Sequence, residues 1–139
     1  MKATIKTDYA CRAIQALALH YPNPQPLCIE EIAKRQRIPS NFLVQILIEL
    51  KRHGLIQSRR GKKGGYVLAR APQQITFADV LRAVQGEVID LSGLSKTDCP
   101  VEIQTAWRHV KTAAERAAQE VTFEHICASA RQAPQMYYI

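Results

Sequence analysis

The feature that most constrains the fold is a pair of short amphipathic helices with a tight turn between them, the first predicted from about Ile29 to Gln36 and the second beginning near Ser40. In the second helix, apolar residues recur at positions i, i+3, i+4 and i+7, which is the spacing of one buried stripe. These residues are Leu43, Ile46, Leu47 and Leu50. The turn Arg37-Ile38-Pro39 leads into this helix, and Gly54 supplies its C-terminal stop. Two helices in this arrangement are typical of a helix-turn-helix.

A β-hairpin is predicted directly after these helices. Two short apolar stretches, residues 55–58 and 66–69, flank a tip rich in glycine and lysine. In this position, a hairpin with a basic loop is the wing of a winged helix-turn-helix. Gly64 and Gly65 lack Cβ atoms, so we expect the backbone there to turn tightly and to approach a phosphate closely.

Charge is distributed unevenly along the chain. Residues 1–71 carry 13 basic and 4 acidic side chains, whereas residues 72–139 carry 6 and 8. From Lys51 to Arg70 there are seven basic residues and no acidic one. This asymmetry favours a module that binds a polyanion, attached to a second part. The alternative is an ordinary charged surface that keeps the protein in solution.

Candidate DNA contacts follow from these two observations. The face of the second helix opposite the apolar stripe presents uncharged polar side chains, and asparagine or glutamine can bond adenine bidentately, which predicts an A-containing half-site. Basic side chains of the wing would contact phosphate or the minor groove. Ile48 also lies on the outward face, where it contacts a thymine methyl group or packs against another element. The predicted DNA-binding residues are Ser40, Asn41, Gln45, Arg52, Arg59, Arg60, Lys62, Lys63, Gly64, Gly65 and Tyr66.

Two further helices are predicted around this module. A first helix begins with Thr7 as its cap and ends before the proline-rich residues 22–26. Another begins after Thr76, with Asp79 completing a capping box, and ends at Gly86. Residues 87–98 have weak periodicity and are predicted to form a loop.

A long helix is predicted from Pro100 to about Glu120. Its apolar positions are spaced alternately by four and three residues, as in a coiled coil, and its length of roughly 30 Å exceeds what so small a domain can cover. We therefore interpret it as a dimerisation helix, and the alternative is a helix packed back on its own domain. The interface positions are Ile103, Trp107, Val110, Ala114, Ala117 and Val121. A short turn of helix from Thr122 and an uninformative tail, residues 133–139, follow.

Other features of the sequence argue against a metal-binding protein, a membrane-spanning protein, a secreted protein and an enzyme. The four cysteines are scattered without metal-ligand spacing, and Cys11 and Cys127 are interpreted as small buried apolar residues. The longest apolar run, residues 42–50, is too short and too interrupted to span a bilayer. Because the N-terminus lacks the apolar region of a secretory signal, we expect a cytoplasmic protein. No nucleophile–base pair, paired carboxylates or phosphate loop indicates an enzyme.

The motifs together resemble the Rrf2 family of winged-helix transcription regulators, which includes the iron–sulfur sensors IscR and NsrR. The resemblance covers almost the whole chain, and its most specific part is the wing sequence Arg60-Gly61 followed by residues 64–69, GGYVLA. Other matching residues are Thr7-Asp8-Tyr9-Ala10, Ile32-Ala33, Ile38-Pro39, Phe42-Leu43, Gln45-Ile46-Leu47, Leu50, Gly54-Leu55-Ile56, Ser58 and Trp107. The resemblance implies a mainly α fold with a small β-hairpin wing, and a homodimer whose long helices cross at the dimer axis and which binds a partly palindromic operator.

The chain departs from the cluster-binding members of that family. Those members carry three cysteines in the loop before the long helix, whereas residues 91–100 keep only Cys99. Gln104 lies near where a ligand histidine is expected, and Asp8 matches an acidic ligand position. One thiolate and one carboxylate cannot hold a cluster that needs four ligands, so no iron–sulfur cofactor or metal is expected.

Cys99 retains two interpretations. It precedes a proline at a helix N-terminus, where the helix dipole would lower the pKa of a thiol and favour a reactive thiolate, as in a single-cysteine redox switch. The alternative is a leftover residue that binds nothing. The signal, whether a small molecule or a redox change, is not legible in the sequence.

The sequence thus predicts three parts: a winged helix-turn-helix DNA-binding domain (1–86), a loop that corresponds to the family's cluster-binding loop (87–99), and a dimerisation helix with a C-terminal tail (100–139). The predicted function is that of a sequence-specific transcriptional regulator, and a repressor is favoured over an activator. The alternatives are a thiol-based regulator that responds through Cys99 and a protein-interaction module that has lost operator choice.

Overall fold

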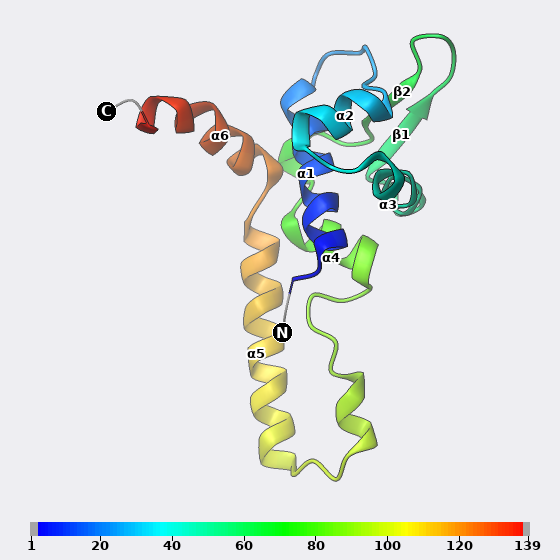
Figure 1. Cartoon of the computed structure of the whole chain (residues 1–139). Helices are drawn as coiled ribbons and strands as arrows, with labels where there is room; N and C mark the ends of the chain where they lie inside the picture. Colours follow the sequence, from blue (N-terminus) through cyan, green and yellow to red (C-terminus); the bar gives the residue numbers. More distant parts are fainter. Residues whose placement is uncertain (1–2, 138–139) are drawn as a thin grey trace.

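The winged-helix half of the molecule is built around α1 (Ile5–His20). In the computed structural model, which describes residues 3–137, this helix packs against α2 (Ile29–Gln36), α3 (Ser40–Arg52), α4 (Phe77–Gln85) and α6 (Phe123–Tyr137). Figure 1 shows α1 at the centre of these elements. Small side chains such as Ala10 and Ala13 are fully buried on α1 and permit this close packing.

The first helix begins earlier than its predicted start at Thr7. Its N-cap is Thr4, whose Oγ1 accepts a hydrogen bond from the main-chain N–H of Thr7 at 3.1 Å. Thr7 is buried instead, and its hydroxyl donates to Oε1 of Gln85 in α4 at 3.1 Å. Two threonines three residues apart both have capping chemistry, and tertiary contact decides between them.

The predicted helix-turn-helix is confirmed. Helices α2 and α3 have the expected bounds, and the turn between them places Arg37 in the left-handed conformation (φ 55°) and buries Ile38. All four residues of the apolar stripe of α3 are at most 1 % exposed. Cys28 occupies the N-cap position of α2 without a side-chain capping bond.

The predicted wing is also present, as the antiparallel strands β1 (Ile56–Arg59) and β2 (Gly65–Leu68), paired from Ile56↔Leu68 to Arg59↔Gly65. An unpredicted feature is a bridge from Leu27 to Tyr66, with reciprocal main-chain bonds of 3.0 and 2.8 Å. A Cβ on Gly65 would lie 2.2 Å from the carbonyl oxygen of Leu27. This glycine is therefore required for the chain to approach itself closely. The close approach to a phosphate expected from the sequence stays a prediction.

The segment after the wing joins the two halves of the molecule. A 3-10 turn, η1 (Pro72–Gln74), leads to α4, whose Thr76–Asp79 capping box forms as predicted. Residues 87–98 contain a second 3-10 helix, η2 (Ser92–Lys96), where only a loop is predicted. In Figure 1 this segment lies beside the N-terminal half of α5 (Val101–Glu120), which extends away from the winged domain.

The C-terminal segment differs most from its prediction. Only a short turn is expected after Thr122, whereas α6 runs from Phe123 to Tyr137. Phe123 and Cys127, one helical turn apart, are buried in the core beneath α1. Residues 138 and 139 of the predicted tail lie outside the described residues. Within residues 3–137, no helix combines the length and apolarity needed to cross a membrane.

Candidate nucleic-acid interface

The outward face of α3 is exposed and mostly uncharged. The buried stripe on its other side holds the helix against α1 and leaves Ser40, Asn41, Gln45 and Arg52 exposed. Ile48 is 44 % exposed, so it does not pack into the core. Val44, which is 46 % exposed, lies on the same face. It is not among the predicted DNA-binding residues, although its spacing of four residues from Ile48 indicates that the two share a helix face. The face therefore offers two amides with exposed apolar side chains beside them.

The acidic residue of α3 is neutralised from α1. Glu49 accepts a hydrogen bond from Nζ of Lys6 at 2.7 Å, and its side chain is only 18 % exposed. Its other oxygen, Oε2, is buried without a hydrogen-bond partner among the described residues. The ion pair fixes α3 to α1 and removes a negative charge that would otherwise repel a phosphate backbone.

The wing lies on the same side of the molecule as α3 (Figure 1). Four of its basic side chains are exposed, and none of the ion pairs found among the described residues involves them. These are Arg59, Arg60, Lys62 and Lys63. Nη1 of Arg59 donates to Oε1 of Gln57 at 3.0 Å, which leaves its charge uncompensated. Arg70, by contrast, lies 3.6 Å from Asp79 in α4.

Three other residues of the predicted site have a structural role in the wing. Tyr66 is half-buried, packs against the core and pairs with Leu27 through its main chain. Gly64 and Gly65 are half-buried, and a Cβ on Gly64 would lie 2.5 Å from the carbonyl oxygen of Arg59. These positions set the direction of the hairpin, and the charged side chains beyond them face solvent.

The predicted dimer positions follow one side of α5. Near its N-terminal half the stripe is solvent-exposed: Ile103 is 50 %, Trp107 43 % and Val110 48 % exposed. Farther along, Ala114 packs against a small second core, made by Ala78, Val88, Ile89 and Ala118. Ala117 and Val121 (39 %) are exposed. Thus one edge of α5 packs on its own domain while the neighbouring apolar stripe lies open.

The cysteines lie in four separate places. Cys99 is half-buried beside Pro100, the N-cap of α5, and Cys28 begins α2. Burial, with a smaller contribution from Asp8, raises the pKa of the Cys11 thiol to about 12, and burial also raises the pKa of Cys127. These two thiols are therefore protonated and inert at neutral pH. Within residues 3–137, no three His, Cys, Asp or Glu side chains come together in a way that could hold a metal ion.

Comparison with known proteins shows that the chain is similar to transcriptional regulators. Residues 3–129 match the Rrf2 family, described as an iron-dependent transcriptional regulator. A candidate helix-turn-helix transcriptional regulator of Synechocystis is 42 % identical over 85 residues, which are 61 % of this chain and 57 % of that protein. One from Mycobacterium tuberculosis is 32 % identical over 135 residues, 94 % of this chain and 83 % of its own.

A solved structure shares the whole architecture. The IscR of T. potens superposes with a TM-score of 0.80 at 29 % identity, over 96 % of this chain and 90 % of that one. The matching elements include both the winged domain and the long helix. The chain nevertheless spans only 57 % of the Synechocystis relative, so similarity in that case covers about half of the longer protein.

Proposed function

Because the chain belongs to the Rrf2 family of transcriptional regulators, we propose that it is a sequence-specific DNA-binding regulator that acts as a homodimer. The observation that carries this proposal is the exposed amide-bearing face of α3 beside four uncompensated cations of the wing. In this arrangement α3 enters the major groove, and the wing lies along the sugar–phosphate backbone.

The base sequence is read by exposed side chains of residues 41–48 of α3. The amides of Asn41 and Gln45 bond adenine edges, as asparagine and glutamine do bidentately. Val44 and Ile48, exposed beside these amides and outside the core, contact thymine methyl groups. An A·T-containing half-site satisfies both kinds of contact.

Two copies of the chain pair through the open stripe of α5. The exposed apolar residues of that stripe, with small alanines farther along, allow two helices to approach closely. A two-fold axis there places the two α3 helices on half-sites about one helical turn of DNA apart, so the operator is partly palindromic. The DNA-binding part comprises residues 1–86 together with the start of α6, which packs into the same core.

The donor set of this chain does not fit an iron–sulfur cluster. Cys99 is the one cysteine of the segment between α4 and α5, and the other thiols belong to α1, to the start of α2 and to α6. Clusters are held mainly by several thiolates that converge on one point. DNA binding through α3 and the wing requires no such group.

Operator choice is tested by selecting bound genomic fragments in vitro with the wild-type protein and with Gln45→Ala. We expect the wild type to retain a recurrent palindrome that contains A·T pairs at symmetric positions. Gln45→Ala should lose discrimination at one symmetric pair of positions, at a cost of about 1–3 kcal/mol for each base contact. Retention of unrelated fragments by the wild type would contradict a regulator and favour a protein-interaction module.

The wing is tested by the double variant Lys62→Ala/Lys63→Ala. Without these two ammonium groups, binding to all duplexes should weaken, and the slope of log K against log salt should fall by about 0.9 for each phosphate that is no longer neutralised. Fluorescence anisotropy at several salt concentrations measures both effects. The matched control is Lys96→Ala/Arg116→Ala, which removes the same charge from positions outside α3 and the wing. Equal slopes for the two variants would place the wing away from the DNA.

A further inference from the structure

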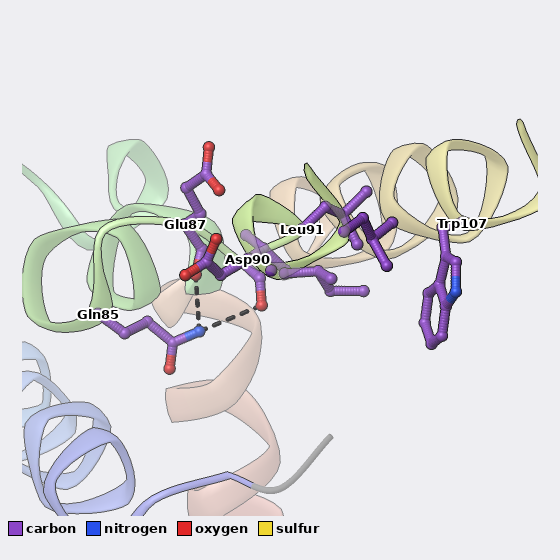
Figure 2. A pocket seen from close by; sticks show the side chains of 9 residues that line it. Gln85, Glu87, Asp90, Leu91 and Trp107 are labelled. Atoms are coloured by element: carbon purple, nitrogen blue, oxygen red, sulfur yellow. Dashed lines mark hydrogen bonds between the residues drawn. The ribbon is translucent and has the colours of Figure 1, made fainter. Parts of the chain in front are cut away.

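A cavity of about 460 Å³ lies between the segment that follows α4 and the N-terminal half of α5. Its size is within the range of small-molecule sites in proteins, about 300–1,000 Å³. The wall is formed mostly by apolar side chains, with Trp107 of α5 on the far side (Figure 2). The lining residues are Gln85, Glu87, Val88, Ile89, Asp90, Leu91, Gly93, Leu94 and Trp107.

The cavity wall is held in place by its own hydrogen bonds. Nε2 of Gln85 donates to the carbonyl oxygens of Glu87 at 2.7 Å and of Val88 at 3.1 Å, as the dashed lines in Figure 2 mark. Oε1 of the same amide accepts from Thr7, which is buried in α1. Val88 and Ile89 are at most 8 % exposed and pack in the second core. The cavity is thus anchored to both α1 and α5.

The charge of the lining is opposite to that of the molecule. The chain carries a net charge of +7, yet two carboxylates and neither a lysine nor an arginine line this cavity. Nζ of Lys111 lies 3.2 Å from Oε1 of Glu87 and offsets that charge from outside the lining. Asp90 instead accepts a hydrogen bond from the main-chain N–H of Ser92 at 2.9 Å, which is the main cause that lowers the pKa of its carboxyl. Lys111 and Lys96 also make smaller favourable contributions to the ionised carboxyl of Asp90. Asp90 is therefore ionised at neutral pH.

We propose that this cavity binds a small organic amine with an apolar body, a ligand site separate from the DNA interface. The apolar body lies against Leu91, Leu94 and the indole of Trp107, and its removal from water supplies most of the affinity. The ammonium group faces the carboxylate of Asp90, at the end of the cavity opposite Trp107. An anion of the same shape meets two carboxylates and is excluded.

The fluorescence of the single tryptophan reports binding without any DNA. Three probes share one skeleton and differ in their head group: 4-phenylbutylamine, 4-phenylbutanol and 4-phenylbutyrate. Excitation at the red edge of the indole absorption limits the signal to Trp107. We expect a saturable change with the amine, about tenfold weaker binding of the alcohol, and no saturable change with the carboxylate.

Asp90→Asn separates charge from shape, because the amide oxygen can still accept the bond from Ser92. It should weaken binding of the amine about fivefold to tenfold and leave that of the alcohol unchanged. Asp98→Asn, an exposed carboxylate of the same segment outside the cavity, is the matched control and should bind as the wild type does. The proposal is overturned if the three probes bind equally, if the two variants behave alike, or if no probe saturates. The last result would follow if a second copy of the chain filled the cavity, since Trp107 also belongs to the open stripe of α5.

Discussion

Replacing Val110 by glutamate should convert the proposed homodimer to a monomer and lower operator affinity by roughly 10²–10⁴-fold. Val110 lies in the exposed part of the α5 stripe, where 48 % of it is accessible in the single chain. In a two-fold interface each substituted residue occurs twice, so two carboxylates would be buried together without partners. Once the subunits separate, the second half-site is no longer bound as an intramolecular event, and the gain from linking two binding modules is lost.

The matched control is Thr112→Glu. Thr112 is exposed on α5, two residues farther along, and points to another side of the helix. The substitution Thr112→Glu introduces the same charge into the same helix but should leave both the dimer and operator binding intact. Sedimentation velocity measures the oligomeric state, and fluorescence anisotropy with the selected operator measures affinity. A Val110→Glu protein that stays dimeric would place the subunit contact elsewhere.

A change of fold can be separated from a change of assembly. Val110 belongs to neither core cluster, so the monomeric variant should retain its helical circular dichroism. It should also retain weak binding to single half-sites, because α3 and the wing are unchanged. Loss of both properties would indicate unfolding, in which case the lower affinity would not measure the subunit contact.

The helix-turn-helix and wing could be predicted from sequence because their signals are local and agree with one another. The four apolar residues of α3, the turn at Pro39, the stop at Gly54 and the glycine-rich tip all lie within about 30 consecutive residues. Each of these local signals predicts a helix, turn or hairpin that is consistent with the elements predicted by the neighbouring signals. The exposed polar face then follows directly, since it is the side of α3 opposite to the buried stripe.

Other features depend on residues far apart in the chain. The cavity combines residues 85–94 with Trp107, and the bridge from Leu27 to Tyr66 joins positions 39 residues apart. Neither pairing has a periodic signature in the sequence. The start of α1 differs from its prediction for a similar reason, because the burial of Thr7 depends on Gln85 of α4.

The full length of α6 is not predictable from its sequence, which has little apolar periodicity. Phe123 and Cys127 are its two fully buried residues among those whose side chains the structure describes, and they become core only through contact with α1 and α4. Phe123 also anchors the junction with α5. Its main-chain N–H donates to the carbonyl oxygen of Ile75 at 3.0 Å, and its ring stacks on Phe77 with centroids 6.3 Å apart.

Phe123→Ala should lower the free energy of unfolding by about 3–5 kcal/mol, because truncation of a buried phenylalanine removes apolar packing and leaves a cavity. Phe123 is 1 % exposed. A change of this size is a large share of the total stability of a small domain, about 5–15 kcal/mol. Urea denaturation at one fixed protein concentration measures it, since the stability of a dimer depends on concentration.

The matched control is Phe42→Ala, the same truncation at a site that is 51 % exposed, where a decrease below about 1.5 kcal/mol is expected. Phe123→Ala should also weaken operator binding at urea concentrations below its unfolding midpoint, where the variant is still folded. The backbone pairing between Thr76 and Thr122 fixes α5 relative to the winged domain, and the stacked rings hold that pairing in place. Looser attachment would leave the two α3 helices of a dimer less well spaced for their half-sites. A decrease for Phe123→Ala no larger than that for Phe42→Ala would show that the burial of Phe123 adds little to the stability of the core.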